Sequence, residues 1–279
     1  MFHVEPMGEN DFLFATILAN TMNWNMAVED FLFNFRLEPG GCFVAFHGKR
    51  RIGIATCISF GKVGWFGNLL VKEKYRKQGA GSLLVRHAVN YLQTRGVQTI
   101  GLYAYPNLTL FYDSLGFRVD EDFSVLCSDA PSSLTSEALR IVGKKQIKKI
   151  EEFDRRQFGG DRKRLLESII LEKGSLSYFC SEGGEIIGYV AATVYEKMAW
   201  VGPLISLESR VDSAEALLKA VIAQLKGKSV YMVLPKKEKT LANMLFNAGF
   251  KEDFSVSRMF LGEAVAKNCI YMAESLERG

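Results

Sequence analysis

Apolar segments in the first half of the chain alternate with turn residues in a pattern that predicts an antiparallel sheet flanked by helices. The turns Gly48-Lys49 and Gly61-Lys62 separate three consecutive segments of strand character, as expected for a meander. The pattern predicts strands at residues 2–5, 42–47, 51–60, 63–71, 99–105 and 117–127, and helices at residues 12–18, 27–35 and 108–115.

The segment from Trp65 to Arg95 runs from an apolar strand through a charged loop into a helix with one apolar face. The loop at residues 76–81, Arg-Lys-Gln-Gly-Ala-Gly, places its glycines at the first helical turn. Free amide groups and the helix dipole favour an anion such as a phosphate there, and glycine permits close approach. The pattern alone is also compatible with a tight turn that binds nothing.

This loop resembles the Arg/Gln-x-x-Gly-x-Gly/Ala signature of the GNAT superfamily of N-acetyltransferases, which a Leu-x-Val strand precedes, here residues 69–71. Further along, Asn107 and the run Phe-Tyr-Asp-Ser-Leu-Gly-Phe at residues 111–117 resemble the second signature of that family. The spacings of a Walker loop and of a dinucleotide fingerprint are absent. The resemblance implies a GNAT fold and coenzyme A as the anionic ligand.

The resemblance also implies roles for individual residues. Tyr112 takes the position of the acid that protonates the departing thiolate, although a tyrosine on a short helix can also serve packing alone. The strand before the loop would bind the thioester where the sheet splays apart, with Gly67 and Asn68 as candidate bulge residues. The implied cofactor-binding residues are Leu69, Leu70, Val71, Arg76, Lys77, Gln78, Gly79, Ala80, Gly81, Ser82 and Asn107.

The sequence identifies the residues that would bind and deprotonate the acceptor less clearly than those of the cofactor site. Many family members carry a glutamate base on the fourth strand, but residues 63–68 contain no carboxylate. Glu29, Asp30 and His47 remain candidates, and so does a chain of water molecules. Trp24 lies between the first two helices, where it either lines the acceptor pocket, as the corresponding loop does in the family, or fills the core.

Composition narrows the remaining classes of protein. Hydrophobic residues make up 48% of the 279 positions, enough for buried cores in one or two domains. With 35 basic and 31 acidic residues, the charge is too balanced to indicate nucleic acid or membrane as a partner. The five cysteines are widely spaced in apolar runs, which indicates reduced core residues. No membrane span or secretion signal is found, so a cytoplasmic location is expected.

The second half of the chain repeats the first. Trp-x-Gly-x-Leu occurs at residues 65–69 and 200–204, and Glu-Asp-Phe-Ser-Val occurs at residues 121–125 and 252–256. Several ordered matches at a nearly constant offset predict two tandem domains of one fold. Residues 129–139 are rich in small and turn-forming residues, and we expect them to link the two domains.

The second copy differs at the cofactor site. Ser213 and Glu215 stand where the first copy has Gly79 and Gly81, and a carboxylate there opposes binding of a diphosphate. We therefore expect the second domain to have lost the cofactor and to complete the acceptor pocket instead. A short strand at residues 269–272 is expected to join one of the sheets.

Two aspartates are candidates for holding a cationic acceptor. Asp154 and Asp161 lie in a segment that resembles the start of the C-terminal domain in two-domain acetyltransferases. The alternative for Asp161 is a helix cap, followed by Arg162 as a solvated charge.

Together these observations predict an α/β protein of two tandem GNAT folds, each a mixed, mostly antiparallel twisted sheet flanked by helices. Residues 1–128 are expected to be the catalytic domain and residues 140–279 a degenerate one. The expected reaction, without a metal, transfers an acetyl group from acetyl-CoA to a primary amine of a small molecule or peptide, by direct attack in a ternary complex. The alternatives are a non-catalytic acyl-CoA binding or sensing protein, and a structural protein. A monomer or homodimer that binds neither nucleic acid nor membrane is expected.

Overall fold

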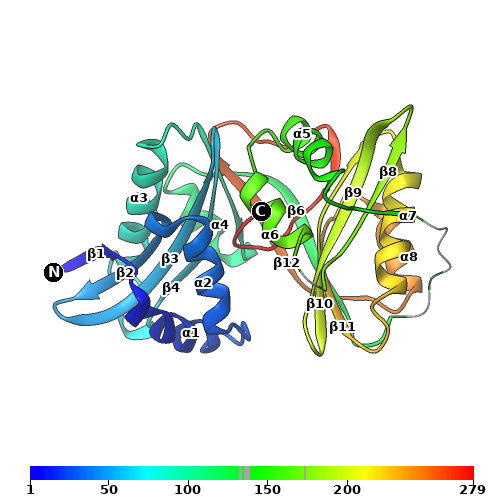
Figure 1. Ribbon diagram of the computed structural model, residues 1–279. Coiled ribbons are helices and arrows are strands. Elements are labelled where there is room, and N and C mark those ends of the chain that lie inside the picture. The colour runs from blue at the N-terminus through cyan, green and yellow to red at the C-terminus, as the bar shows by residue number, and fades with distance from the viewer. Residues whose placement is uncertain (132–133, 135–138, 173) are drawn as a thin grey trace.

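The computed structural model describes residues 1–131, 134, 139–172 and 174–279. Figure 1 shows two helix-flanked halves on either side of a central group of strands. The N-terminus lies at the outer edge of the first half, and the C-terminus lies in the middle of the molecule. Most of the predicted linker, residues 129–139, lies outside the described residues, and the domain boundaries stay a prediction.

Thirteen strands of the described chain form one sheet, in the order β1-β2-β3-β4-β5-β12-β6-β11-β10-β9-β8-β7, with β13 paired to β10. They are β1 (Phe2–Pro6), β2 (Cys42–His47), β3 (Arg50–Phe60), β4 (Val63–Val71), β5 (Thr99–Ala104), β6 (Arg118–Ser128), β7 (Arg140–Ile141), β8 (Leu176–Glu182), β9 (Glu185–Val194), β10 (Met198–Leu207), β11 (Ser229–Pro235), β12 (Lys251–Leu261) and β13 (Cys269–Met272). The pairs β4–β5 and β10–β11 are parallel and the others are antiparallel. The predicted mixed, mostly antiparallel sheet is confirmed.

Helices cover both faces of the sheet. They are α1 (Phe12–Asn20), α2 (Val28–Leu37), α3 (Ala80–Gln93), α4 (Thr109–Asp113), α5 (Ile147–Phe158), α6 (Lys163–Ile170), α7 (Val211–Ala223) and α8 (Lys239–Asn247). In the first half, Val44 of β2 packs in the cluster of α1 and α2, while its neighbour Phe43 packs in the cluster of α3. Successive side chains of a strand point to opposite faces, so α1 and α2 lie on one side of the sheet and α3 lies on the other.

The two halves exchange their last long strands. β6 comes from the first half in sequence but pairs with β11, while β12 of the second half pairs with β5. Where β6 and β12 meet, the two copies of Glu-Asp-Phe-Ser-Val lie antiparallel, with Ser124 opposite Ser255 and Phe123 opposite Val256. Because equivalent residues face each other, an approximate two-fold axis passes through this pair, and the two predicted sheets merge into one.

A shared core joins the halves where the strands are exchanged. Trp65 and Phe123 of the first half pack in one buried cluster with Phe153, Tyr189 and Tyr271 of the second. Figure 1 shows α5 and α6 above this central region, beside the C-terminus. The relative placement of the two halves is therefore fixed by buried apolar contacts as well as by the sheet.

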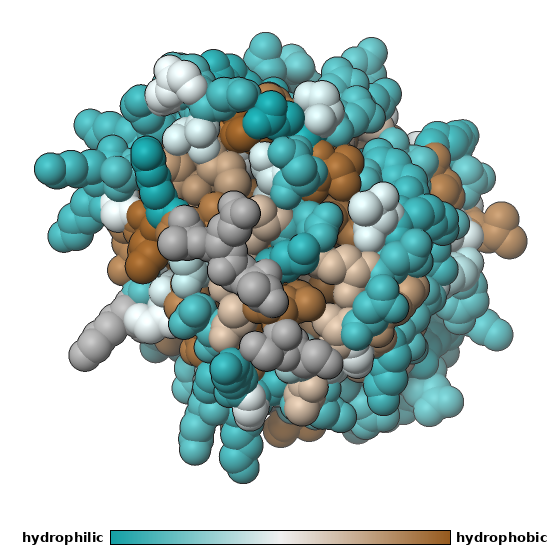
Figure 2. Space-filling model, turned by 90° about the vertical axis from the view of Figure 1, so that its right-hand side faces the viewer, coloured by the Kyte–Doolittle hydropathy of each residue, from teal (hydrophilic) through white to brown (hydrophobic). Residues whose placement is uncertain are grey.

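The outer face of the second half is covered by α7 and α8, whose leucines pack in a separate buried cluster. Figure 2 shows this face: hydrophilic side chains occupy most of its rim, and apolar ones gather towards its middle. Throughout the described residues, none of the helices combines the length and the apolar character needed to cross a membrane.

Candidate active site

The sheet opens between β4 and β5. The two strands pair only where Val63–Trp65 lie opposite Thr99–Gly101. Beyond that point the register of β4 with β3 shifts, and Asn68 adopts a φ of +51°. The Asn68 side-chain amide, which is buried, donates to the Thr56 hydroxyl at 3.1 Å and holds this bulge in place. The predicted bulge at Gly67-Asn68 is confirmed, and residues 66–71 line a gap.

Backbone donors of β4 face this gap. The Lys72 amide donates to the Ile52 carbonyl on β3 at 2.8 Å. Because successive amides of a strand point to opposite sides, the amides of Val71 and Leu69 point away from β3. The Val71 carbonyl also points away from β3, where it accepts from Arg76 Nε at 2.9 Å. Neither amide has a hydrogen-bond partner among the residues that the structure describes, so both are available to a ligand in the gap, as the resemblance implies for residues 69–71.

Helix α3 begins beside the end of the gap. Gly79 is its N-cap, with a φ of +90° that favours glycine, and a Cβ there would find no atom within 4 Å. Within the described part of the chain no side chain caps this helix, and the first-turn amides, including those of Ala80, Gly81 and Ser82, have no partner there. Residues 76–79 are exposed. The predicted anion-binding loop therefore has free donors with open space above them.

Positive charge surrounds this end of the sheet. An open hollow of about 340 Å³ is lined by Phe14, Lys49, Arg50, Arg51, Lys72, Lys74 and Tyr75. Of its cations, Arg51 pairs with Asp11 at 2.5 Å, and Lys72 lies over the Phe14 ring at 4.9 Å. The excess of cations raises the local concentration of anions next to the loop.

Tyr112 lies beside the start of the gap. Its ring packs against Phe66 of β4 and against Phe111 and Phe117, with centroid distances of 6.4, 5.0 and 6.0 Å. Burial raises its pKa, so the phenol stays protonated at neutral pH. In the part of the chain that the structure describes, its hydroxyl has no hydrogen-bond partner. Asn107 is exposed in the turn between β5 and α4.

Helices α1 and α2, whose connecting loop is a predicted lining of the acceptor pocket, pack on the face of β4 opposite Tyr112. Trp24 is half-buried, and its indole N–H donates to the Tyr105 hydroxyl, directly after β5, at 3.2 Å. Residues 273–279, which we call the C-terminal segment, cover the neighbouring part of the same face. The Trp65 indole donates to the Leu276 carbonyl of this segment at 3.3 Å. Trp24 thus lies at the edge of the face that the segment occupies.

Asp154 lies in the interior and does not face an open pocket. Its carboxylate accepts from Arg162 Nε at 3.2 Å and Nη2 at 2.6 Å, and it also accepts from the Tyr189 hydroxyl. Both partners of the ion pair have fully buried side chains. Burial opposes the charge of Arg162, but the charge and hydrogen bond of Asp154, together with Tyr271 and Tyr189, raise its pKa. We assign Asp154 to this ion pair and not to amine binding, and the expectation that Arg162 is a solvated charge is wrong.

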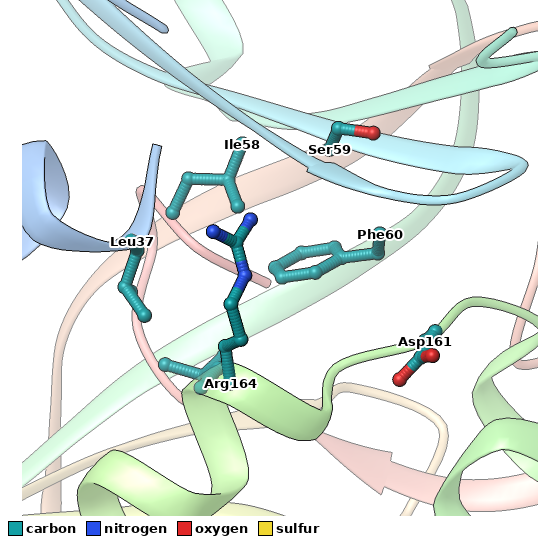
Figure 3. A pocket seen from close by; sticks show the side chains of 7 residues that line it. Leu37, Ile58, Ser59, Phe60, Asp161 and Arg164 are labelled. Carbon is teal, nitrogen blue, oxygen red and sulfur yellow. The ribbon is translucent and has the colours of Figure 1, made fainter. Parts of the chain in front are cut away.

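Asp161 is exposed and acts at a helix start. Its carboxylate accepts from the Lys163 amide at 3.1 Å, as the helix-cap alternative predicts. It also lines a cavity of about 10 Å³, shown in Figure 3, into which the Arg164 side chain extends between Leu37 and Phe60. Such a cavity holds about one water molecule and no substrate amine. The structure therefore gives Asp161 a capping role.

In the second half the parallel strands β10 and β11 also separate, but another strand fills the space between them. β10 pairs with β11 only over Met198–Val201, and β13 pairs with β10 from Leu204 to Leu207 beyond it. The predicted strand at Cys269–Met272 is confirmed, and it fills the position that the gap has in the first half. α7 begins at Val211, so the expected match of Glu215 with Gly81 is wrong: Glu215 is the fifth residue of the helix, where it pairs with Lys219 at 2.5 Å, and the acidic residue of the first turn is Asp212. Both features oppose binding of a cofactor in this half.

Comparisons with known proteins agree with this architecture. Residues 13–117 match the model of the acetyltransferase (GNAT) family, and residues 150–271 match a second acetyltransferase (GNAT) domain model. The two matches together span most of the chain. The chain therefore belongs to the GNAT acetyltransferases and carries two GNAT domains in tandem, as predicted from the sequence.

The individual proteins that are similar to this chain share less than a quarter of its sequence. The chain is 24% identical over 211 residues to a Bacillus subtilis protein named uncharacterized N-acetyltransferase YitH, covering 72% of this chain and 71% of that protein. It is similar in structure to a putative acetyltransferase from Pyrococcus horikoshii, with a TM-score of 0.81 at 22% identity over 100% of this chain and 96% of the other. A tandem GNAT protein from the clavulanic acid biosynthesis pathway gives a TM-score of 0.64 at 14% identity, covering 95% and 99%. These structures support the tandem fold.

Proposed function

We propose that this protein is an acetyl-CoA-dependent N-acetyltransferase whose acceptor, a primary amine of a small molecule or peptide, attacks the thioester directly in a ternary complex. One observation carries the proposal. The first half keeps an open gap between β4 and β5 that leads to the uncapped start of α3, whereas β13 closes the equivalent gap in the second half. A single cofactor site per chain follows.

The residues around the gap fit coenzyme A. The amides of residues 80–82 and the flanking cations suit its diphosphate, and the free amides of Leu69 and Val71 suit the pantetheine and the thioester carbonyl. Acetyl-CoA supplies an activated acetyl group. The Tyr112 phenol, which burial keeps protonated, donates a proton to the departing sulfur. No metal is needed, because backbone amides stabilise the negative charge that develops on the carbonyl oxygen.

Calorimetry with coenzyme A tests the cofactor site. We expect one site per chain, and we expect Gly81→Glu to weaken binding about 100-fold or more, because a carboxylate would face the diphosphate. The matched control is Asp212→Gly in the first turn of α7, which removes the carboxylate at the helix position that Gly81 has in α3. It should add no second site, since β13 still occupies that gap. Binding that survives Gly81→Glu unchanged would contradict the proposed location.

Thiol release from acetyl-CoA in the presence of primary amines tests the activity. Tyr112→Phe should lower kcat about 100-fold and leave the Kd for coenzyme A unchanged, because it removes a proton donor and keeps the ring packing. Coenzyme A binding without thiol release by any amine would instead support the sensing module.

A further inference from the structure

The C-terminal segment packs Glu277 against the strand that lacks a carboxylate of its own. A Cβ built on Gly67 of β4 would lie 2.5 Å from both Cα and Cβ of Glu277. The Glu277 backbone therefore occupies the space into which a side chain at position 67 would project. Gly67 immediately precedes the bulge at Asn68 and the free amides of the gap.

Alternation along β4 defines the face that Glu277 occupies. Phe66 packs beside Tyr112 and α3, while Trp65 packs in the central cluster with the second half. Gly67 shares the face of Trp65, because side chains two apart on a strand point the same way. Glu277 and Tyr112 thus lie on opposite faces of the sheet at the position where β4 and β5 separate. The acceptor amine and the departing sulfur lie on different sides of the reacting carbonyl carbon. The reaction therefore needs a base on one side and an acid on the other.

The charges around Glu277 favour a cation. Arg278 Nη1 contacts a Glu277 carboxylate oxygen at 2.6 Å, but the same guanidinium donates to both oxygens of Glu274, at 2.8 and 3.1 Å. Asp30 of α2 is also close enough to Glu277 to raise its pKa. Arg278 thus pairs with two carboxylates, and a third, that of Asp30, lies near Glu277. Glu277 keeps 18% of its side chain exposed, whereas Glu274 keeps 4%.

Tyr195, in the turn between β9 and β10, belongs to the same group of interacting side chains as Glu277. Burial together with Asp30, Glu274 and Glu277 raises the pKa of Tyr195 to about 12, with Arg278 opposing. Tyr195 is therefore a neutral phenol at physiological pH, and Arg278 is the cation that faces Glu277 from these elements. β4 contributes no charge on this side, since Trp65 and Gly67 are uncharged.

We propose that Glu277 is the general base of the reaction and that it accepts the proton of the acceptor amine on the face of β4 opposite Tyr112. This inference rests on the acetyltransferase function proposed above. A residue far from the fourth strand in sequence thereby supplies the carboxylate that the strand does not carry.

The other candidates have different roles in the structure. Asp30 accepts from the Ala27 amide at 2.8 Å as part of the cap of α2, and Glu29 is exposed beside it. His47 ends β2, next to the edge strand β1, and its ring lies 5.3 and 5.6 Å from those of Phe2 and Tyr75. Of the groups considered, Glu277 is the one whose backbone touches β4 at the gap.

The transfer balances with these two residues. The amine nitrogen forms a bond to the acetyl carbon, and the carbon–sulfur bond breaks. The acceptor ammonium first gives one proton to the Glu277 carboxylate. After the free amine attacks, the nitrogen gives a second proton to solvent, and the Tyr112 phenol gives one to the departing thiolate. Burial, with Glu274 and Asp30, raises the pKa of Glu277 and Arg278 lowers it, and a raised pKa makes the carboxylate a stronger base. Proton exchange with solvent then returns Glu277 to the carboxylate and Tyr112 to the neutral phenol.

The test uses Glu277→Gln in the full chain, with Glu274→Gln as the matched control. Tyramine, spermidine and an alanine-initiated tripeptide serve as probe amines. We expect Glu277→Gln to lower kcat/KM about 100-fold at pH 7 and to abolish the acidic limb of its pH profile. The deficit should shrink above the pKa of the amine, since a free amine needs no base. Glu274→Gln removes the bidentate partner of Arg278, so it should lower Tm while the acidic limb remains.

A binding measurement complements the kinetics. In calorimetry with the coenzyme A complex, Glu277→Gln should weaken the best probe amine about tenfold at pH 7, because a charged hydrogen bond to the ammonium is lost. If the wild type acetylates a probe and Glu277→Gln keeps both its pH profile and its amine affinity, the role of Glu277 is refuted and the acetyltransferase remains. If the wild type binds coenzyme A and acetylates none of the probes, the proposed function fails, and the role of Glu277 fails with it.

Discussion

Replacement of Asp154 by asparagine separates a structural role from a substrate-binding role. The substitution keeps the shape of the side chain and removes the negative charge that faces Arg162. The guanidinium would then remain fully buried and face neutral groups such as the Tyr189 and Tyr271 hydroxyls, each at 3.4 Å. A buried charge without its counter-ion is among the most costly defects in a folded protein.

The expected loss follows from burial and chain length. Removing one partner of a fully buried ion pair costs about 3–5 kcal/mol. An unfolding entropy of about 2.1 cal/mol/K per residue gives about 0.6 kcal/mol/K for 279 residues. Asp154→Asn should therefore lower Tm by about 5–8 °C. Replacing both partners, as in Asp154→Leu with Arg162→Met, should recover most of this loss, because no charge is left unpaired.

Thermal unfolding followed by circular dichroism measures the effect. Glu167→Gln is the control, because it breaks the exposed pair with Lys163, whose atoms lie 3.9 Å apart, and such pairs contribute little. Its Tm should stay within about 1 °C of the wild type. An Asp154→Asn protein that melts like the wild type but shows a strongly raised KM for the amine would refute the assignment and restore Asp154 to the acceptor site.

Three further predictions concern the gap, the C-terminal segment and the thiols. Gly79→Ala should cost about 1–2 kcal/mol in urea unfolding because of its φ of +90°, whereas Gly81→Ala, whose Cβ would lie 3.5 Å from Phe111, should be tolerated. Gly67→Ala should displace the C-terminal segment, because its Cβ would lie 2.5 Å from Glu277, and amide exchange of residues 274–279 should accelerate; unchanged protection would show that the segment does not pack on β4. Burial, followed by the charge of Glu38, raises the pKa of Cys42 to about 12, and burial also raises that of Cys57, so neither thiol should react with Ellman's reagent at pH 8 until the protein unfolds. Rapid labelling of either thiol in the native protein would contradict their placement.

The sequence specified the local elements of the first half closely. β2 and β4 have the predicted bounds, Cys42–His47 and Val63–Val71, because nearly continuous apolar runs bounded by turn residues leave little freedom. β13 likewise has its predicted bounds. The start of α3 at Ala80 follows from the glycines before it, and the bulge at Asn68 was anticipated beside Gly67. These features depend on neighbours within a few residues, which is why pattern and turn chemistry predict them.

The repeat in the sequence also predicted two copies of one fold, but not how they join. The identical segments at residues 121–125 and 252–256 indicate equivalent strands, yet nothing in them shows that the two strands pair with each other. Pairing between distant strands depends on which edges are available after each half has formed. Only the tertiary structure shows that β6 and β12 change places and merge the sheets.

Some features of the candidate site could be predicted from the sequence, and others depend on the tertiary structure. Its cofactor loop and Tyr112 come from contiguous motifs, so the sequence alone was sufficient to propose them. The burial of Arg162 beside Asp154 and the closure of the second gap by β13 arise from segments brought together by folding. Glu277 belongs to an ordinary charged run in the sequence, and its contact with Gly67 depends on where the C-terminal segment docks. Short-range patterns determined the elements and the anion loop, whereas long-range packing decided which charges are buried and which carboxylate reaches β4.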